Sequence, residues 1–553
     1  MKKKRITSFV MAAAMILSAL TACSGQSGSE GTSSAASEAA SSEGTSTVQE
    51  DDGREMVGNM YVEGLPILKE KETYTMAIAR DPASKNTYAE KACVIEMENQ
   101  TNIHIEWLET PVSGWDEKVN IMLASGDLPD AFSYQVNDLM KNSSLFVPLN
   151  DYVEKYAPNV QEMFAAEPEL KSGCTAPDGN MYSPPTYRFD PSSTVTSGMW
   201  INMEWLDKLG LTMPETPDEF VEVLRAFRDQ DPNGNGQADE IPLGAIQSTG
   251  NGLHGIDVLF GPFGVVDTPE YVYAKDGEVI FTGQQDGYFD GLQWVHQLYS
   301  ERLIDQELFT MTDAQFSAKA QNEDTIYGVM MSWLPDTYVS NYLEVYEIMP
   351  PLKGENGEQL WNKARTPGGN MAGFCITTKC EHPEVLVRYF DNNISTTENI
   401  MLWYNGPEGE GIWKYDDDGI HWMETTEYIP EGVSSGEFER TVAAGPYSPA
   451  RLWSKYDDLR IQEPRVLKRI EVNEMYLQYA VDVMPNGIED PDVVNERSLL
   501  FTDIDNYMKK FKANAVVEGI TEEQWQTHLE TLNSYNVDQY VSLWQEFYDT
   551  KKQ

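Results

Sequence analysis

Lys118-Val-Asn-Ile-Met-Leu-Ala-Ser-Gly126-Asp127-Leu-Pro129-Asp130-Ala-Phe-Ser-Tyr134 joins a predicted helix to a predicted strand. Val119, Met122 and Leu123 fall on one helical face, and Gly126 suits the left-handed conformation that commonly ends a helix. The last five residues of the segment have the length and apolar centre of a short strand. The segment therefore predicts one helix-to-strand step of an α/β fold.

The chain upstream continues this alternation. Residues 74–78 and 103–107 have the alternating pattern of strands, and residues 87–100 between them carry apolar side chains on one helical face. The order strand, helix, strand, helix, strand predicts a parallel sheet with helices on both faces.

Ligands of such sheets bind beyond the carboxyl ends of the strands. Arg80 and Asp81 follow the first predicted strand, and Tyr134 and Gln135 follow the third. These residues are candidates for a binding site, the alternative being that they are ordinary loop residues.

A second α/β segment begins near residue 195. Residues 199–202, 326–331 and 373–377 predict strands, and Thr216-Pro-Asp-Glu219 is a capping box with proline at the first helical position. Thr521-x-x-Gln524 opens a further helix near the C-terminus. With 553 residues, of which 41% are hydrophobic, the chain can form about three or four folding units.

The first 22 residues have the pattern of a signal peptide. Lys2-Lys-Lys-Arg5 is a basic start, residues 6–20 are uncharged and mostly apolar, and Leu20-Thr-Ala-Cys23 resembles the lipobox of bacterial lipoproteins. Cleavage before Cys23 and lipidation of that cysteine are predicted, the alternative being an ordinary signal peptide with a chance cysteine. Residues 23–65 are expected to form a flexible linker, because most of them are small or polar.

The chain is strongly acidic. Lys and Arg number 40 and Asp and Glu number 89, so the formal net charge is −49. That field repels polyanions and excludes nucleic acid as a partner. With five Cys and six His, the chain has few residues that could form a transition-metal site or a disulfide framework. Whether the four cysteines other than Cys23 are paired is left open: Cys93, Cys174, Cys375 and Cys380.

One loop has the opening of a calcium site. Oxygen-bearing side chains stand at positions 1, 3 and 5 and glycine stands at position 6, which brings successive hard oxygens around one centre. Position 12 is Pro242, so the loop is not a complete EF-hand, and the closing carboxylate must come from Asp239 or Glu240. The predicted ligands to a structural Ca²⁺ are Asp231, Asn233, Asn235, Gln237, Asp239 and Glu240. The alternative is a polar turn without an ion.

Two glycine-rich motifs match the residue patterns of enzyme motifs, but neither match is by itself evidence of an enzyme. Gly250-Asn-Gly-Leu-His-Gly255 matches a dinucleotide fingerprint and Gly432-Val-Ser-Ser-Gly436 matches a nucleophile elbow, and we interpret both as turns. A glycosidase pair of carboxylates cannot be singled out among 89 acidic residues.

Aromatic side chains are abundant, with 13 Trp and 28 Tyr. Many belong to the core, but several stand beside Gly, Pro, Asn or Ser, where flat rings and amides suit the faces and hydroxyls of sugars. The candidates are Trp200, Trp333, the run Trp403-Tyr404-Asn405-Gly406, Tyr447 and Trp453.

The segment 118–130 closely resembles a signature of bacterial extracellular solute-binding proteins of family 1, the substrate-binding subunits of ABC sugar importers. Residues 176–184, 205–219 and 369–378 resemble further segments of that family in the same order, and the likeness extends over nearly all of the chain after residue 66. It implies a type 2 periplasmic-binding-protein-like α/β fold of two discontinuous lobes joined by hinge strands. The lobes are expected to comprise residues 66–187 with 372–443 and residues 188–371 with 444–553, with crossings near 183–190, 366–376 and 440–447.

The resemblance also implies a ligand between the lobes. The residues expected to face it, from the resemblance and from the sequence patterns together, are Arg80, Tyr134, Gln135, Trp200, Asn202, Trp333, Asn370, Trp403 and Tyr447.

We therefore expect a monomeric, lipid-anchored, extracytoplasmic receptor on the outer face of the cytoplasmic membrane. It would capture a saccharide by hinge closure and deliver it to ABC permease subunits, without acting as an enzyme. The alternatives are a binding protein for a peptide or other non-sugar solute and a secreted carbohydrate-active enzyme.

Overall fold

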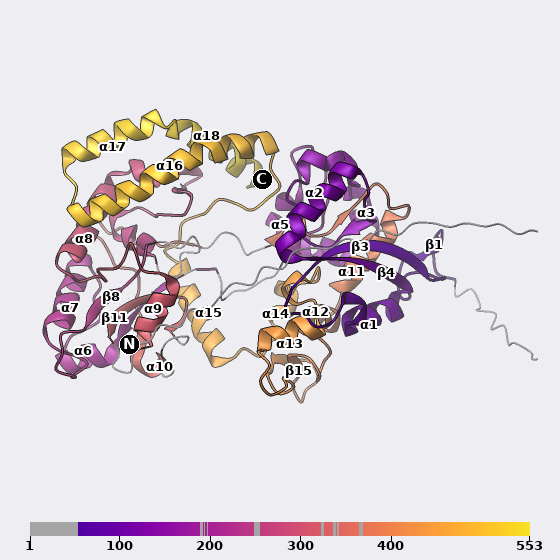
Figure 1. Ribbon diagram of the computed structural model, residues 1–553, viewed down its shortest axis with the longest axis horizontal. Helices are drawn as coiled ribbons and strands as arrows, with labels where there is room; N and C mark the ends of the chain where they lie inside the picture. Colours follow the sequence, from indigo (N-terminus) through magenta and orange to yellow (C-terminus); the bar gives the residue numbers. More distant parts are fainter. Residues whose placement is uncertain are drawn as a thin grey trace, which may run out of the picture. The chain divides into compact units, whose positions relative to one another are not determined.

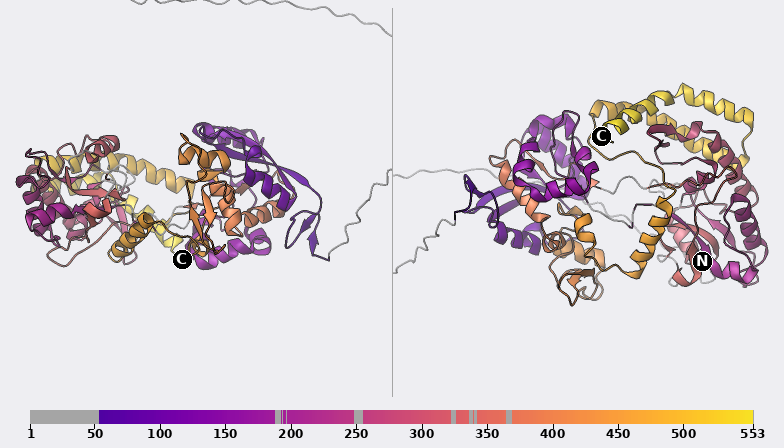
Figure 2. Two further views of the ribbon diagram at one scale, coloured as in Figure 1. Left: turned by 90° about the horizontal axis from the view of Figure 1, so that it is seen from below. Right: turned by 180° about the vertical axis from the view of Figure 1, so that it is seen from behind.

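The computed structural model describes residues 53–187, 192, 194–195, 197–247, 255–321, 326–335, 339, 342–363 and 369–552. Within the compact unit Arg54–Gln553, buried apolar side chains form two separate hydrophobic cores. Each core is built on a four-stranded sheet flanked by helices (Figures 1 and 2). We call the part around Met76 and Phe132 the first lobe and the part around Val329 and Leu224 the second lobe.

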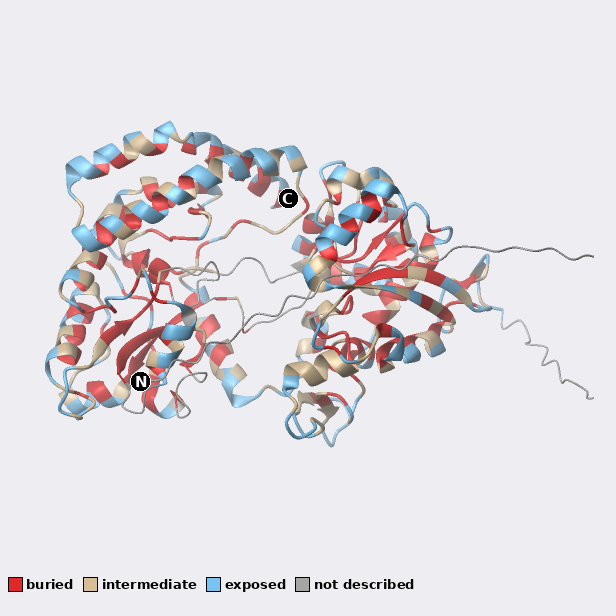
Figure 3. Ribbon diagram, in the orientation of Figure 1, coloured by how far each residue is buried: buried red, intermediate tan, exposed pale blue. Residues whose placement is uncertain are grey.

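The sheet of the first lobe has the strand order β14-β5-β3-β4. Strand β3 pairs in parallel with both β4 and β5, and β14 pairs antiparallel with β5. The predicted parallel order is therefore present, with an antiparallel strand added at one edge. The centre of β3 is buried on both faces (Figure 3). The strands are β3 (Glu72–Arg80), β4 (Ile103–Pro111), β5 (Ala131–Phe132) and β14 (Cys375–Ile376).

The helices that follow these strands largely match the sequence pattern. Helix α2 (Trp115–Ser125) buries Val119, Met122 and Leu123, and it ends at Gly126 with φ 74°. The helix predicted over residues 87–100 begins later, because a 3₁₀ turn precedes α1 (Ala92–Thr101). The other helices of this lobe are α3 (Asn150–Tyr156), α4 (Pro158–Ala166), α5 (Pro168–Cys174), α11 (Pro383–Asn393), α12 (Thr397–Asn405), α13 (Ser435–Val442) and α14 (Ser454–Asp457).

The sheet of the second lobe has the order β12-β7-β11-β8. Strand β7 lies antiparallel between β11 and β12, and β11 is parallel to β8. Both predicted capping boxes form, at Thr216 and at Thr521. The strands are β7 (Gly198–Asn202), β8 (Ile241–Gly244), β11 (Tyr327–Ser332) and β12 (Tyr346–Ile348). The helices are α6 (Met203–Leu209), α7 (Pro217–Asp229), α8 (Asp286–Ser300), α9 (Asp313–Ala320), α10 (Tyr342–Val345), α15 (Pro464–Leu477), α16 (Pro491–Glu518), α17 (Glu522–Ser534) and α18 (Val537–Lys551).

Two of the three predicted crossings between the lobes contain paired strands. Strand β6 (Thr186–Tyr187) lies antiparallel to β13 (Gly369–Asn370). The third crossing comes later than the predicted 440–447, because Ala444, Leu452 and Tyr456 pack in the core of the first lobe. The first lobe therefore extends beyond residue 443, and the chain crosses just before α15.

The flexible linker predicted to reach residue 65 ends earlier. Strands β1 (Met56–Val57) and β2 (Met60–Tyr61) form a hairpin, and Met60 and Leu68 are buried in the first core. Arg388 of α11 donates to the carbonyl oxygens of Tyr61 and Gly64. Residues 54–68, the N-terminal hairpin segment, are therefore part of the first lobe.

The long C-terminal helix α16 packs along α8 in the second lobe (Figure 1). Its Lys512 is buried, with Nζ 2.9 Å from Asp257 Oδ1 and 2.5 Å from Asp267 Oδ2. One cation thus faces two buried carboxylates. Burial raises the pKa of Asp267 despite the opposing charge of Lys512. This triad fixes α16 to the segment that precedes β9 (Val272–Lys275).

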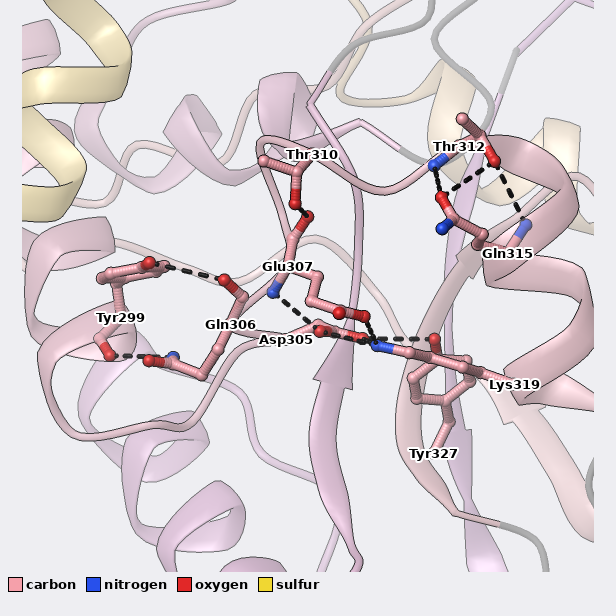
Figure 4. A network of polar contacts seen from close by, with 9 residues as sticks. All are labelled: Tyr299, Asp305, Gln306, Glu307, Thr310, Thr312, Gln315, Lys319 and Tyr327. Carbon is pink, nitrogen blue, oxygen red and sulfur yellow. Dashed lines mark hydrogen bonds and ion pairs between the residues drawn. The ribbon is translucent and has the colours of Figure 1, made fainter.

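A second polar network holds α9 against β11. Lys319 Nζ lies 2.8 Å from Asp305 Oδ2 and 2.7 Å from Glu307 Oε2, and Tyr327 Oη donates to Asp305 (Figure 4). The nearly buried carboxylate of Asp305 is thereby paired, as a buried charge requires.

His528 of α17 stacks on Phe511 of α16, with ring centroids 3.7 Å apart. Nε2 donates to the Gly283 carbonyl, so Nδ1 accepts from Tyr507 in the neutral ring. Burial lowers the pKa of His528 to about 4.

We predict that the protein loses stability as acid protonates His528. The unfolded pKa of histidine is about 6.5, so the contribution is complete above about pH 6.5 and is lost as pH falls toward 4, reaching about 3 kcal/mol. Urea unfolding at pH 7 and at pH 4.5 would measure it. His528→Gln should show a smaller loss between the two pH values, and a loss equal to that of the wild type would contradict the assignment.

The four cysteines of the described part, Cys93, Cys174, Cys375 and Cys380, are buried free thiols. In the same part, no helix is both long enough and apolar enough to traverse a bilayer.

Candidate functional site

A cavity of about 290 Å³ is lined by aromatic and charged side chains from both lobes. We call it the aromatic cavity. Trp333 follows β11 of the second lobe, and Tyr404 and Asn405 end α12 of the first lobe. Its charged lining residues are Glu424, Glu439, Arg460, Glu463 and Arg465.

Both rings of the aromatic cavity are oriented by guanidinium groups. Arg465 and Arg469 lie 5.6 and 5.5 Å from the ring centroid of Trp333, and Arg451 lies 5.1 Å from that of Tyr404. Trp333 Nε1 also donates to the Ser192 carbonyl at 3.3 Å. A cation is attracted to the face of an aromatic ring, so these contacts restrict the orientation of both rings.

Asn405 provides an acceptor without a partner in this cavity. Its side chain is 1% exposed, and among the described residues its Oδ1 accepts no hydrogen bond. A buried amide oxygen without a donor is costly, so this oxygen is an unusual feature of the cavity wall.

Beside this cavity, Asp81 holds two residues of the segment after α12. Its Oδ2 accepts from Arg440 Nε at 2.9 Å and from Tyr447 Oη at 3.0 Å. Burial acts to raise the pKa of Asp81, but hydrogen bonds and the charge of Arg440 outweigh it and keep that pKa below its ordinary value. Tyr447 packs against Tyr134, with centroids 5.3 Å apart. Two of the predicted residues, Tyr134 and Tyr447, are thus brought together.

Helix α13 carries Glu439 and is fixed by a buried cation. Lys91 Nζ donates to the carbonyl oxygens of Arg440 at 2.7 Å and Ala443 at 2.6 Å, at the C-terminal end of the helix. A cation at this end is favoured by the helix dipole. Burial nevertheless lowers the pKa of Lys91 to about 8.

Lys91→Met is therefore expected to destabilise the fold by about 1–3 kcal/mol, because two buried carbonyls lose their donor. Hydrogen exchange should accelerate in residues 435–447. Lys85 pairs with Glu437 of the same helix but is exposed, so Lys85→Met should change stability by less than about 0.5 kcal/mol. Equal effects of the two substitutions would contradict the assignment.

A second cavity, of about 430 Å³, is lined by amide side chains of the first lobe, by the segment around Ile488, which packs in the first core, and by the first residues of α16. We call it the amide cavity. Its amides are Gln135, Asn137, Asn370, Asn486 and Asn495. The Gln135 amide donates to Asn137, Asn137 donates to Asp116 at 2.8 Å, and Asn370 Oδ1 accepts from the Ala372 amide at 2.9 Å. Two further predicted residues, Gln135 and Asn370, therefore share one cavity.

Four predicted residues do not face these cavities. Trp200 and Trp403 are 0% exposed, and Asn202 is 1% exposed and caps α6 by accepting from the Trp205 amide. These three belong to the core, because β7 is an interior strand and Trp403 packs on Trp107. Arg80 turns to the Ser84 carbonyl and Glu109.

Sequence reasoning named the run Trp403-Tyr404-Asn405-Gly406 but chose only Trp403 from it as a ligand-facing residue, and it missed Arg460 and Arg465. Of this run, Trp403 is buried in the first core, whereas Tyr404 and Asn405 line the aromatic cavity. Trp453, the remaining aromatic candidate, is 1% exposed and belongs to the first core.

In the predicted calcium loop, side-chain oxygens accept hydrogen bonds from nearby amides and so form a series of tight turns. Asp231 Oδ1 and Oδ2 accept from the amides of Gly234 at 3.0 Å and Gly236 at 3.2 Å. The Asp239 carboxylate accepts from the side-chain amides of Asn233 and Asn235 at 3.0 Å. Four of the six predicted ligands, Asp231, Asn233, Asn235 and Asp239, thus make hydrogen bonds within this loop.

The loop has a feature that fits a cation. Glu240 Oε1 is buried, and in the described part of the chain it accepts no hydrogen bond. Burial, with the charges of Asp239 and Asp231, raises the pKa of Glu240. Across the described residues, no three His, Cys, Asp or Glu side chains come close enough to hold a metal by themselves. An ion here would therefore need the Asn oxygens and the Gln237 carbonyl as well.

The sequence model for the bacterial extracellular solute-binding proteins matches residues 78–417. The chain belongs to this family. This solute-binding protein is 30% identical over 503 residues to the fructooligosaccharide ABC transporter substrate-binding protein FusA of Streptococcus pneumoniae, which covers 87% of this chain and 91% of FusA.

Solved structures agree with the family assignment. The complex of S. pneumoniae FusA with kestose is 28% identical and superimposes with a TM-score of 0.69, covering 87% of this solute-binding protein and 99% of FusA. A structure of a FusA EF-hand mutant is similar at 27% identity and a TM-score of 0.68, with the same coverage. A solute-binding protein of Bifidobacterium longum infantis, at 23% identity and a TM-score of 0.76 over 87% of this chain and 99% of its own, shares the fold. The predicted family and two-lobed α/β fold are thereby confirmed.

Proposed function

We propose that this chain is the substrate-binding protein of an ABC importer and captures a saccharide in the aromatic cavity. The observation that carries the proposal is the buried, unpartnered Oδ1 of Asn405 beside Tyr404 and Trp333. Aromatic rings accept the C–H faces of a sugar ring, and amides and carboxylates bond its hydroxyls. The names of the FusA relatives support the saccharide class.

Capture works by closure of the two lobes. Trp333 belongs to the second lobe and Tyr404 to the first, so neither lobe alone holds both rings. A ligand that touches both favours the closed state by the difference in its affinity for the two states. The paired strands β6 and β13, with the chain before α15, provide the hinge. No chemical step on the sugar is part of this function, so we propose a binding protein rather than an enzyme.

The cellular location that we propose rests on the N-terminal sequence. Cys23 carries the lipid, the protein stands as a monomer at the outer face of the cytoplasmic membrane, and its partners are permease subunits. The net charge of −49 opposes any role in nucleic-acid binding.

A thermal-shift screen of the chain lacking residues 1–22 against a glycan panel tests the proposal. At least one neutral oligosaccharide should raise the melting temperature, and small-angle scattering should show compaction with that sugar. Stabilisation by peptides alone, or release of shorter sugars from a bound oligosaccharide over hours, would overturn it.

We further propose that Ca²⁺ stabilises the second lobe at residues 231–240. The ligands are Asp231, Asn233, Asn235, Asp239 and Glu240, with the Gln237 carbonyl, and the buried Glu240 oxygen supports the choice. The existence of an EF-hand mutant of FusA supports it too. When bound, the ion would offset two of the three carboxylate charges of this loop.

Chelation is expected to lower the melting temperature, because an ion that binds only the folded state adds its binding free energy to stability. Asp231→Ala should abolish that response. Asp418→Ala is the matched control, since Asp418 also accepts backbone amides, of Ile420 at 2.8 Å and His421 at 2.9 Å, in an unrelated turn. An unchanged melting temperature of the wild type with chelator would refute the site.

A further inference from the structure

The sequence contains six Asn-Gly pairs, a dipeptide in which the asparagine side chain can react with the next backbone nitrogen. Glycine favours this reaction because it has no side chain to block the approach. One pair, Asn251-Gly252, lies outside the described residues. The pairs in the described part of the chain are Asn233-Gly234, Asn235-Gly236, Asn356-Gly357, Asn405-Gly406 and Asn486-Gly487.

The reaction of such a pair is deamidation. The glycine nitrogen attacks Cγ of the asparagine, a C–N bond forms, the bond from Cγ to Nδ2 breaks, and ammonia leaves with the proton of the glycine amide. Water then opens the cyclic imide at either carbonyl and yields aspartate or isoaspartate. The reaction therefore needs a side chain that can turn, a glycine nitrogen that can be reached, and access for water.

Two of the pairs are held by hydrogen bonds within the loop of residues 231–240. Nδ2 of Asn233 donates to Asp239, and its Oδ1 accepts from the backbone amide of Asn235, both at 3.0 Å. Asn235 also donates to Asp239, at 3.0 Å, and accepts from the Gln237 amide at 2.8 Å. Both glycine nitrogens donate to Asp231. Neither side chain can turn toward its glycine without breaking several hydrogen bonds.

Two further pairs are confined by packing. Asn405 is 1% exposed, and a β-carbon on the glycine that follows it would lie 2.7 Å from Val442. Asn486 is half-buried, and a β-carbon on the next glycine would lie 2.7 Å from Lys551. In both pairs a neighbouring side chain restricts the movement that brings the glycine nitrogen to Cγ.

Asn356 and Gly357 lie in an exposed turn of the second lobe. Among the described residues, the Asn356 side chain makes no hydrogen bond. Apart from its chain neighbours, no atom lies within 4 Å of the position that a β-carbon on Gly357 would take. The Gly357 nitrogen donates to the Gly354 carbonyl at 3.0 Å, a bond that water can replace because the turn is exposed. All three requirements of deamidation are met here.

We propose that Asn356 is a site of spontaneous modification, which deamidates ahead of the other described Asn-Gly pairs. The product has one more negative charge, and isoaspartate lengthens the main chain of the turn by one carbon. The turn has little room for that carbon, because a β-carbon on Gly354 would already lie 1.8 Å from the Pro262 carbonyl oxygen. Since water is the only co-reactant, the modified fraction increases with the age of the molecule.

Peptide mass spectrometry of the folded chain, incubated at mildly alkaline pH with a chelator so that no bound calcium contributes, tests the assignment. The peptide that contains Asn356 should gain the mass of the exchange of –NH2 for –OH. We expect this gain to be at least about tenfold faster than in the peptides of the other described pairs, the factor that one or two hydrogen bonds supply. Asn356→Gln should abolish the gain in that peptide.

The matched control is the same chain unfolded in guanidinium chloride, where every Asn-Gly pair has lost its tertiary contacts. The five pairs should then deamidate at rates within about threefold of one another, because little persistent structure remains to distinguish them. Equal rates at Asn356 and at the loop pairs in the folded chain would overturn the proposal. The same spread of rates in the unfolded chain would also overturn it, because the neighbouring residues in sequence would then set the order.

Discussion

Lys512→Met is expected to lower the free energy of unfolding by about 3–5 kcal/mol, the usual cost of removing one partner from a buried ion cluster. Lys512 is the only cation placed by the structure against both Asp257 and Asp267, within the described part of the chain, and all three side chains are buried. Without it, two carboxylates remain in an apolar surrounding and must take up protons to stay folded. The loss should therefore be larger at pH 8 than at pH 5, in chemical unfolding monitored by tryptophan fluorescence.

The same helix supplies the control for this experiment. Lys509 pairs with Asp505 at 2.7 Å but is 60% exposed, so Lys509→Met should cost less than about 0.5 kcal/mol. Should Lys512→Met prevent folding altogether, the triple variant with Asp257→Asn and Asp267→Asn should restore folded protein, because it removes the buried charges. Similar stabilities of Lys512→Met and Lys509→Met would contradict this account of the triad.

Tyr404→Ala is expected to weaken saccharide binding by about 2–4 kcal/mol, or roughly 30-fold to 1,000-fold, which is the range of a ring at the centre of a binding site. The substitution removes one of the two rings of the aromatic cavity and releases Arg451 from its stacked position. Tyr404→Phe keeps the ring and should retain most of the affinity. Calorimetry with the tightest sugar of the glycan panel measures both variants.

Tyr415→Ala serves as the control for Tyr404. Tyr415 lies in the same lobe and donates to Glu398 at 2.6 Å, but it does not line the aromatic cavity. It is expected to leave sugar affinity within about twofold of wild type, since side chains outside a binding site contribute little to its free energy. A loss of affinity in Tyr415→Ala equal to that in Tyr404→Ala would mean that the effect is one of folding, and unfolding curves of both variants separate these cases.

Much of the fold could be predicted because its signals are local. Gly126 ends α2, Thr216 opens α7, and alternating apolar residues mark β3 and β4. Each of these depends on residues within one or two turns of the chain. The family resemblance supplied the rest of the lobe order, and the third crossing was placed too early because residues 444–456 are packed by partners distant in sequence.

The site was harder to predict, because the orientation of an aromatic side chain depends on its neighbours in space. Trp403 and Tyr404 are adjacent in α12, and only the packing of Trp403 on Trp107 decides which of them is buried. Trp200 stands in a strand between β11 and β12, where its ring meets Tyr342. Local sequence contains neither contact. The turns of residues 231–240 were predictable for the opposite reason, since the oxygens and amides that form them lie within ten residues of one another.

The N-terminal hairpin segment has a mechanical consequence. Met60 and Leu68 are buried in the first core, and Arg388 donates hydrogen bonds to carbonyls of the same segment. A force on the chain that precedes Arg54 therefore acts on the first lobe alone. A lipid at Cys23 would therefore hold the first lobe at the membrane and leave the second lobe free to move. Closure would then bring the second lobe toward a first lobe that stays in place.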